Sequence, residues 1–176
     1  MKMTVKMGRH PTGSGDGKAM EWLVLAKEEG RMLLLSKECL AEQPFHCSAA
    51  AVTWADCDLR GWLRDLEEDW FTPEERARIL TTAVETSEEC CYDDESIPED
   101  RGIVTEDRLF LLSAREAWKY FEKDEDRQSG TGWWLRSRGY SPGYAADVLP
   151  SGEVCGSGEE VYEPGGVRPA MWVRIL

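Results

Sequence analysis

The C-terminal part of the chain reads Trp133-Trp134-Leu135-Arg136-Ser137, then a run rich in Gly, Ser, Tyr and Glu, and then Gly166-Val167-Arg168-Pro169-Ala170-Met171-Trp172. The two outer segments are largely apolar, each contains one arginine, and both are typical of buried strands. The residues between them predict short strands and loops whose outward side chains are free to vary. A functional face is therefore expected between the two segments.

Composition limits the function classes that fit the chain. Its 176 residues suit one domain, residues 1–176. The net charge of −13 argues against nucleic-acid binding, which would need a basic patch, and against an anionic membrane surface. No apolar run approaches the ~20 residues of a membrane span, and no signal peptide is recognisable. We therefore expect a protein that is made in the cytoplasm and is not inserted in a membrane. The sequence does not indicate whether it stays in the cytoplasm or reaches a virion or a cell surface.

The cysteines predict free thiols and no metal site. They are Cys39, Cys47, Cys57, Cys90, Cys91 and Cys155, and none forms a C-x-x-C pair. His10, His46 and Cys47 lack the second spaced pair of a structural zinc site. The segment Glu85–Asp100 is acidic, has no Lys or Arg and predicts a surface loop. A calcium loop is the alternative, but the D-x-D-x-D-G spacing is absent. The sequence therefore predicts neither a metal nor another cofactor.

Strand patterns occupy the N-terminal third. Met3–Met7 alternates and predicts a first strand. The apolar runs Trp22–Ala26 and Met32–Ser36 flank a Gly-containing turn, which predicts a hairpin that is buried on both faces. The Gly- and Pro-containing segment His10–Lys18 predicts a loop.

Helix patterns lie in the middle of the chain. Thr53 or Asp56 is the expected N-cap of a first helix, and Thr72-Pro73-Glu74-Glu75 is a capping box that predicts a second helix as far as about Thr82. Arg108–Leu112 predicts a buried strand, and the capping box Ser113-Ala114-Arg115-Glu116 then opens a third helix. The helical residues expected in the core are Leu59, Trp62, Leu63, Leu66, Trp118 and Phe121.

Strands at both ends and helices between them predict an α+β fold. About three helices separate strands that join one mixed or antiparallel sheet. The prediction places Trp22–Leu25 and Val167–Val173 in that sheet, and Pro169 indicates an edge or a bulge in the last strand.

Several motifs in fixed order resemble a largely uncharacterised family of bacterial and phage domains that is common in gut communities. That family carries W-W-L-R-S-P-G and G-V-R-P-A-L motifs near its end. The matching segments here are Glu21–Leu25, Leu34–Lys37, Val52–Trp54 with Leu59–Leu63, Phe110–Phe121, Trp133–Gly139 and Gly166–Met171. Arg138 replaces the usual proline and Met171 the usual leucine.

The C-terminal part also resembles C-type-lectin-like domains, including the variable proteins of diversity-generating retroelements and the formylglycine-generating enzymes. In the variable proteins the diversified residues lie between the W-L-R and G-V-R segments. The resemblance implies one C-type-lectin-like domain that binds a protein or a surface glycan, without catalysis, through residues 138–164. A structural domain of a phage or surface complex is the alternative. An enzyme is disfavoured because Cys155 stands alone where the formylglycine-generating enzymes use a cysteine pair.

Alternation along the short strands separates an outer, ligand-binding set from an inner, supporting set. Tyr, Ser and Gly are favoured in binding loops but also mark hairpin turns, expected here at Ser151-Gly152 and Ser157-Gly158. The expected ligand-binding residues are Arg138, Tyr140, Ser141, Tyr144, Leu149, Glu153, Cys155, Glu159, Glu160, Tyr162 and Glu163. The expected supporting residues are Trp134, Ala146, Val148, Val154, Val161, Val167 and Trp172.

Arg136 and Arg168 have two possible roles. Each could bind an anion, but their apolar neighbours favour a buried ion pair with a local carboxylate such as Asp147. Glu163-Pro164-Gly165 is the nearest approach to a calcium-dependent sugar-binding motif, and Gly165 offers no side-chain oxygen.

Overall fold

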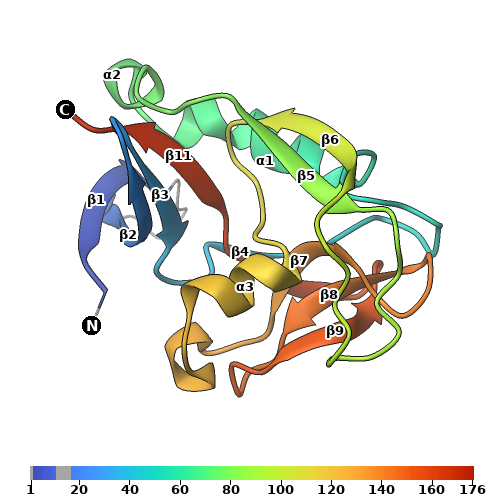
Figure 1. Cartoon of the computed structure of the whole chain (residues 1–176). Helices are drawn as coiled ribbons and strands as arrows, with labels where there is room; N and C mark the ends of the chain where they lie inside the picture. Colours follow the sequence, from blue (N-terminus) through green and yellow to red (C-terminus); the bar gives the residue numbers. More distant parts are fainter. Residues whose placement is uncertain (1, 11–16) are drawn as a thin grey trace.

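Strands from both ends of the chain form one antiparallel sheet, sheet A (Figure 1). The computed structural model describes residues 2–10 and 17–176, so the predicted loop His10–Lys18 lies mostly outside the described residues. Sheet A has the order β1-β2-β3-β11. Its strands are β1 (Thr4–Arg9), β2 (Ala19–Glu28), β3 (Arg31–Ser36) and β11 (Ala170–Arg174). The α+β class and the shared sheet of the two chain ends are confirmed.

The β2–β3 hairpin forms as predicted. Gly30 has a φ of 75° in its turn, a conformation that glycine adopts without steric cost. Five of the six residues of β3 are buried, whereas most residues of β2 are half-buried or exposed. Burial on both faces therefore holds for β3 and not for β2.

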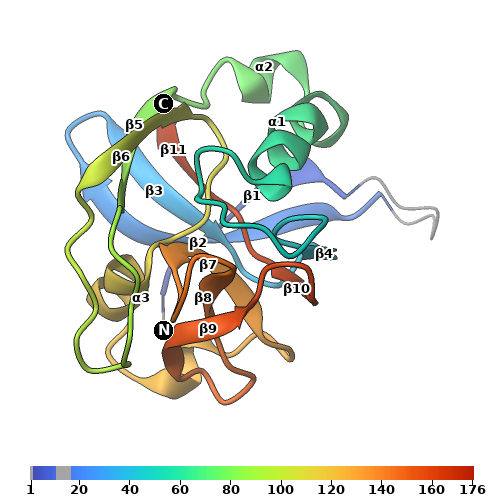
Figure 2. The same ribbon diagram turned by 90° about the vertical axis from the view of Figure 1, so that its right-hand side faces the viewer.

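Sheet B lies beside sheet A and holds the C-terminal face (Figure 2). Its order is β4-β10-β7-β8-β9. Its strands are β4 (Ala41–Pro44), β7 (Trp133–Arg138), β8 (Tyr144–Val148), β9 (Val154–Glu160) and β10 (Pro164–Val167). All neighbours are antiparallel except β7 and β10, which are parallel.

The chain changes sheets at Arg168 and Pro169, which corrects the prediction of one strand from Val167 onward. Val167 ends β10 in sheet B, and Ala170 begins β11 in sheet A. Pro169 has no N–H for a strand ladder, but its carbonyl accepts a hydrogen bond from Ser36 N at 2.9 Å. The residues of the G-V-R-P motif thus connect the two sheets.

The second of the two predicted turns is wrong. The turn at Ser151-Gly152 forms, but β9 continues through Ser157 and Gly158 to Glu160, and the chain turns at residues 161–163. Gly158 instead sits at a β-bulge with a φ of 70°. A Cβ at this position would lie 1.9 Å from the carbonyl oxygen of Ala145, so only glycine fits.

A small hairpin, sheet C, was not predicted. It pairs β5 (Thr82–Ser87) with β6 (Gly102–Asp107). The first residues of the expected acidic loop therefore belong to β5, and the loop proper covers residues 88–101. Polar and charged side chains dominate both strands, which hides them from a search for apolar runs.

The helices are α1 (Asp58–Trp70), α2 (Pro73–Arg76), α3 (Ala114–Tyr120) and the 3-10 helix η1 (Asp124–Arg127). Capping boxes form at Thr72 and Ser113, as predicted. The N-cap of α1 is Cys57, which makes no side-chain cap bond, so neither Thr53 nor Asp56 caps it. No helix in the described part of the chain combines the length and the apolar composition of a membrane span.

The segment after α2 and the segment before α3 differ from prediction, because their backbones form hydrogen bonds with β11 of sheet A. The helix α2 ends at Arg76 instead of continuing to Thr82, and Leu80 N donates to Trp172 O in β11 at 2.8 Å. Arg108–Leu112 is mostly buried but is no strand; only Phe110 forms a bridge, to Ala170. Both segments lie along β11.

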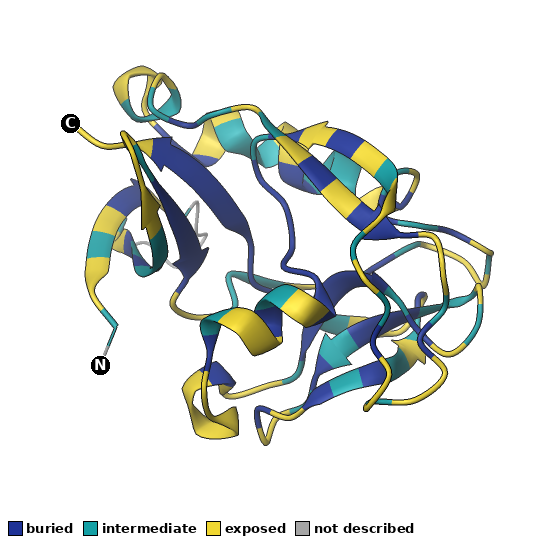
Figure 3. Cartoon of the chain, viewed as in Figure 1, coloured by how far each residue is buried: buried dark blue, intermediate teal, exposed yellow. Residues whose placement is uncertain are grey.

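Figure 3 colours the ribbon by burial. Most of the side chains predicted for the core are buried or half-buried. Leu59, Leu63 and Phe121 are buried, and Trp62 and Leu66 are half-buried. Trp118 is 41% exposed, which contradicts its core assignment. The buried positions of the short helix α3 are Ala114 and Ala117, so the neighbouring Trp118 turns toward solvent. Trp133, Trp134 and Trp172 are core residues, as expected.

Candidate ligand-binding face

The structure separates the predicted outer residues from the supporting ones. None of the expected ligand-binding residues is buried, and all of the expected supporting residues are. Tyr140 and Tyr162 are among the most exposed large side chains of the described chain, at 56% and 40%. The scaffold for a surface between Arg138 and Pro164 is therefore present.

Tyr144, Glu160 and Tyr162 form one group on this face. Tyr144 and Glu160 are paired across β8 and β9. The Tyr144 hydroxyl donates to Glu160 Oε1 at 3.3 Å, and the Tyr162 hydroxyl donates to Glu160 Oε2 at 2.5 Å. The hydrogen bond to this carboxylate raises the pKa of Tyr162 to about 12, and the negative charge of Glu160 raises the pKa of Tyr144. One carboxylate thus holds two neutral phenols in fixed positions.

Asp147 and Cys155 form a second group, also paired across β8 and β9. Burial raises the pKa of Asp147 to about 7, and the charge of Glu159 adds to this effect. A hydrogen bond with Cys155 acts in the opposite direction and lowers the pKa of Asp147. Asp147 Oδ1 is buried and has no hydrogen-bond partner among the described residues. Cys155 Sγ also lies 3.3 Å from Ser157 Oγ.

The acidic loop 88–101 covers this second group, which the sequence did not indicate. Figure 1 shows the loop descending from β5 alongside β8 and β9. Ser157 N donates to Asp94 Oδ1 at 3.0 Å, and Cys91 N donates to the carbonyl of Gly139 at 3.0 Å. Tyr92, which is 70% exposed, meets Tyr140 edge to face with ring centroids 6.1 Å apart. The loop therefore adds residues to the face, Tyr92 above all.

The two groups lie on different sides of β8. Tyr144 and Asp147 are three positions apart in a strand whose side chains alternate, so they point to opposite faces. The charge of Glu159 nevertheless raises the pKa of both Tyr144 and Asp147. The expectation that the outer residues form one contiguous surface stays a prediction.

The remaining predicted residues mark the ends of this region. Leu149 and Glu153 flank the β8–β9 turn, where Leu149 N donates to Glu153 O at 2.9 Å. Ser141 O accepts from Tyr144 N at 2.9 Å in the β7–β8 connection. Glu163 N donates to Glu160 O at 3.0 Å in the β9–β10 turn, and Arg138 Nη1 donates to Glu88 O at 2.7 Å. The binding role of all of them stays a prediction.

Arg136 is buried in an ion pair, as expected, but its partner is not Asp147. Its guanidinium bonds Glu116, which is also the capping residue of α3, and lies 3.9 Å from Asp100. It also donates to Glu85 O at 2.8 Å and to Leu111 O at 2.9 Å. Arg136 therefore connects β7 to sheet C and α3.

Arg168 has no carboxylate partner among the described residues, which corrects the expected ion pair. It is 1% exposed and donates to three backbone carbonyls: Ser36 at 2.7 Å, Lys37 at 2.9 Å and Arg127 at 3.0 Å. Its guanidinium carbon lies 4.9 Å from the ring centroid of Trp133. Burial lowers the pKa of Arg168 to about 10.

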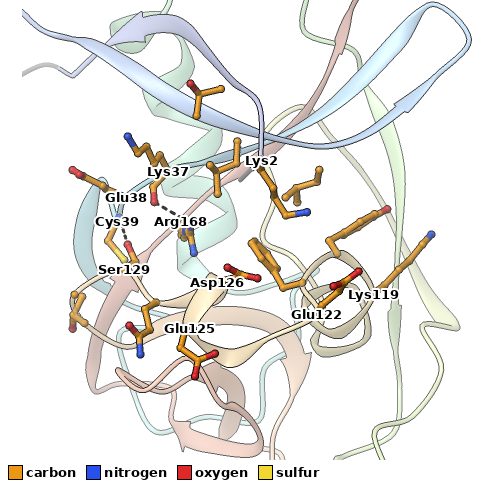
Figure 4. A pocket seen from close by; sticks show the side chains of 18 residues that line it. Lys2, Lys37, Glu38, Cys39, Lys119, Glu122, Glu125, Asp126, Ser129 and Arg168 are labelled. Carbon is orange, nitrogen blue, oxygen red and sulfur yellow. Dashed lines mark hydrogen bonds between the residues drawn. The ribbon is translucent and has the colours of Figure 1, made fainter.

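Arg168 lies at the wall of a large cavity of about 1260 Å³ (Figure 4). The side chains that line it carry both signs, with Lys2, Lys37 and Lys119 positive and Glu122 and Glu125 negative (Figure 4). Each of the three guanidinium nitrogens of Arg168 donates to a backbone carbonyl. Arg168 joins sheet A to η1 and is a structural residue.

Comparison with known proteins places the chain in a family. The profile of a domain of unknown function, DUF6273, matches residues 29–175. The chain belongs to the DUF6273 family. No curated protein and no solved structure matches the chain. The DUF6273 match includes the whole face between Arg138 and Pro164, whereas β1 and β2 precede it.

Proposed function

We propose that this DUF6273 protein is a non-catalytic binding domain of C-type-lectin-like fold. Its binding surface lies between Arg138 and Pro164 and is a variable surface of the kind that diversity-generating retroelements alter in gut bacteria and phages. One observation carries the proposal: side chains predicted to contact a ligand reach solvent, while the side chains beneath them are buried without exception. Such a scaffold tolerates exchange of the outer residues, because exposed substitutions change stability by only about 0.5 kcal/mol.

The chemistry of the face suits a protein or a surface glycan. Tyr140, Tyr92 and Tyr162 offer rigid amphipathic rings, which give contact area at low entropic cost. Glu159 and Glu163 are exposed and negative, so a partner with cationic or hydrogen-bond-donating groups is favoured. Cys155 fits a packing role, because its half-buried thiol is held by contacts with Ser157 and Asp147.

Replacing Tyr140, Tyr144 and Tyr162 together by serine tests this function. The melting temperature should fall by about 5 °C or less, because the three rings are exposed or half-buried. Binding to a ligand selected from a glycan array or from bacterial surface proteins should fall at least about tenfold. Trp134→Ala, which removes a buried ring, is the contrasting control and should unfold far more easily. If the triple variant does not fold, the tyrosines belong to the scaffold and the proposal fails.

A further inference from the structure

His46, Cys47 and Asp58 bring three different metal-ligating side chains together on the opposite side of β10 from the strands of the binding face. One potential ligand atom from each residue lies within 4.8 Å of the other two. His46 and Cys47 follow β4, and Asp58 is the first residue of α1. His46 Nδ1 and Asp58 Oδ2 are 3.2 Å apart. His46 and Cys47 have no second spaced pair of ligands in the sequence, and the fold supplies Asp58 as a third ligand.

We propose that these three side chains bind a zinc ion, with water in the fourth position. Zn–N and Zn–O distances of ~2.0–2.1 Å and a Zn–S distance of ~2.3 Å place tetrahedral ligand atoms roughly 3.3–3.7 Å apart. The observed separation of His46 Nδ1 from Asp58 Oδ2 is already close to this range, and the 4.8 Å limit for the set leaves a movement of about 1 Å. Cys47 and Asp58 are exposed, which leaves the fourth position open to solvent.

Backbone hydrogen bonds fix both sides of this cluster before any metal arrives. Leu59 N donates to Phe45 O at 3.1 Å, which holds the start of α1 against the residue before His46. Cys47 N donates to Asp58 Oδ2 at 2.8 Å, and His46 N donates to Val161 O at 2.9 Å. Little chain ordering therefore remains to oppose binding, and zinc has to replace the long bond of 3.3 Å that Asp58 N donates to His46 Nδ1.

The donor set selects zinc over calcium or magnesium. A thiolate and an imidazole are ligands that zinc accepts and that the hard, oxygen-seeking cations do not. With Cys47 deprotonated and Asp58 ionised, two negative charges balance the two positive charges of the ion. Asp58 also offsets the positive end of the α1 dipole, which would otherwise repel a cation at this place. The thiol proton leaves to solvent as the metal binds.

The position of the site gives it a structural role for the binding face. Through His46 N and Val161 O it adjoins the β9–β10 turn, which carries Tyr162 and Glu163. A bound zinc would hold His46 and Cys47 against the start of α1, and it would thereby stabilise the backbone that contacts the β9–β10 turn. This inference does not depend on the proposed function, since it rests on the three side chains alone.

Titration of the chelator-treated full chain with zinc chloride tests the inference. Calorimetry should show one zinc ion per chain, and cobalt substitution should give the absorption of thiolate-bound Co²⁺. Cys47→Ser and Asp58→Asn should each weaken zinc binding at least about tenfold and abolish or shift that absorption. Cys90→Ser, which alters a half-buried thiol outside the cluster, should leave both unchanged.

Three results would overturn the site. They are no zinc binding by the wild-type chain, an equal loss in Cys90→Ser, and undiminished binding in Cys47→Ser, which would mean adventitious binding by other thiols. Cys47→Ser changes an exposed side chain, so without metal it should melt like the metal-free wild type, and its loss of binding cannot be mistaken for unfolding. Asp58→Asn keeps an oxygen that can accept from Cys47 N but loses the negative charge at the start of α1, so its metal-free melting temperature is measured beside its zinc affinity.

Discussion

Replacing Arg168 by lysine should lower the free energy of unfolding by about 3 kcal/mol or more. Arg168 donates to the carbonyls of Ser36, Lys37 and Arg127, which lie on two different parts of the structure. A lysine ammonium is a single point on a flexible stem and cannot reach three carbonyls in the plane of a guanidinium. Arg127 O keeps the hydrogen bond that Trp133 Nε1 donates at 3.0 Å, but the Ser36 and Lys37 carbonyls lose the donor that Arg168 supplies. A buried carbonyl that loses its donor costs about 1–3 kcal/mol. Chemical denaturation measures the difference.

Arg174→Lys is the matched control for this prediction. Arg174 is the last residue of β11, and its side chain is exposed. Its replacement should change the free energy of unfolding by about 0.5 kcal/mol or less. An Arg168→Lys loss below about 1 kcal/mol would show that the guanidinium does not hold sheet A to η1, and its place at the cavity would then need another explanation.

Asp147→Asn should stabilise the protein at pH 8 by on the order of 3 kcal/mol. The pKa of Asp147 is raised to about 7 in the folded state by burial and by the charge of Glu159. The folded protein therefore binds this proton more tightly than the unfolded chain does. Stability from this group is full below the unfolded pKa of about 4 and is lost as the pH rises toward 7. Asparagine removes that loss.

Urea denaturation at pH 4.5 and pH 8 measures this effect. The advantage of Asp147→Asn over the wild type should be small at the lower pH and large at the higher one. Glu153→Gln changes an exposed carboxylate of the same region and should show no such difference. An advantage for Asp147→Asn that is the same at both pH values would contradict the raised pKa.

Local sequence signals predicted the local structure well. The capping boxes at Thr72 and Ser113 and the glycine turn at Gly30 each depend on residues within a few positions of one another, so they were readable. The helix after Thr72 was predicted too long, since its continuation pairs with β11, a strand that lies far along the sequence. Tertiary pairing overrode helix propensity there.

The sequence predicted which residues of the face are buried, but it did not predict which other segments contact the face. Alternation identified the inner residues at the start of β9, where Val154 is buried and Cys155 is half-buried. In β8 the strand period alone does not separate the two sets, because Tyr144 has the same parity as the buried Ala146, and Ala145 is buried as well. The acidic loop contacts the face through Asp94 and Ser157, which are more than sixty positions apart, and through Tyr92 and Tyr140. No local sequence pattern predicts contacts between segments so far apart. No sequence pattern singled out Asp58, and only the fold brings it to His46 and Cys47.

The central claim is that the residues between Arg138 and Pro164 are exchangeable on a constant scaffold. Sequencing the locus of this protein in sibling isolates tests it most directly. The account predicts differences concentrated at the exposed positions, such as Tyr140, Glu159 and Tyr162, beside an adenine-rich template copy and a reverse transcriptase. Trp134, Val148 and Val167 should be unchanged, because they are buried beneath the face. Differences spread evenly along the chain, or no differences in this region among loci that carry the template copy, would contradict the account.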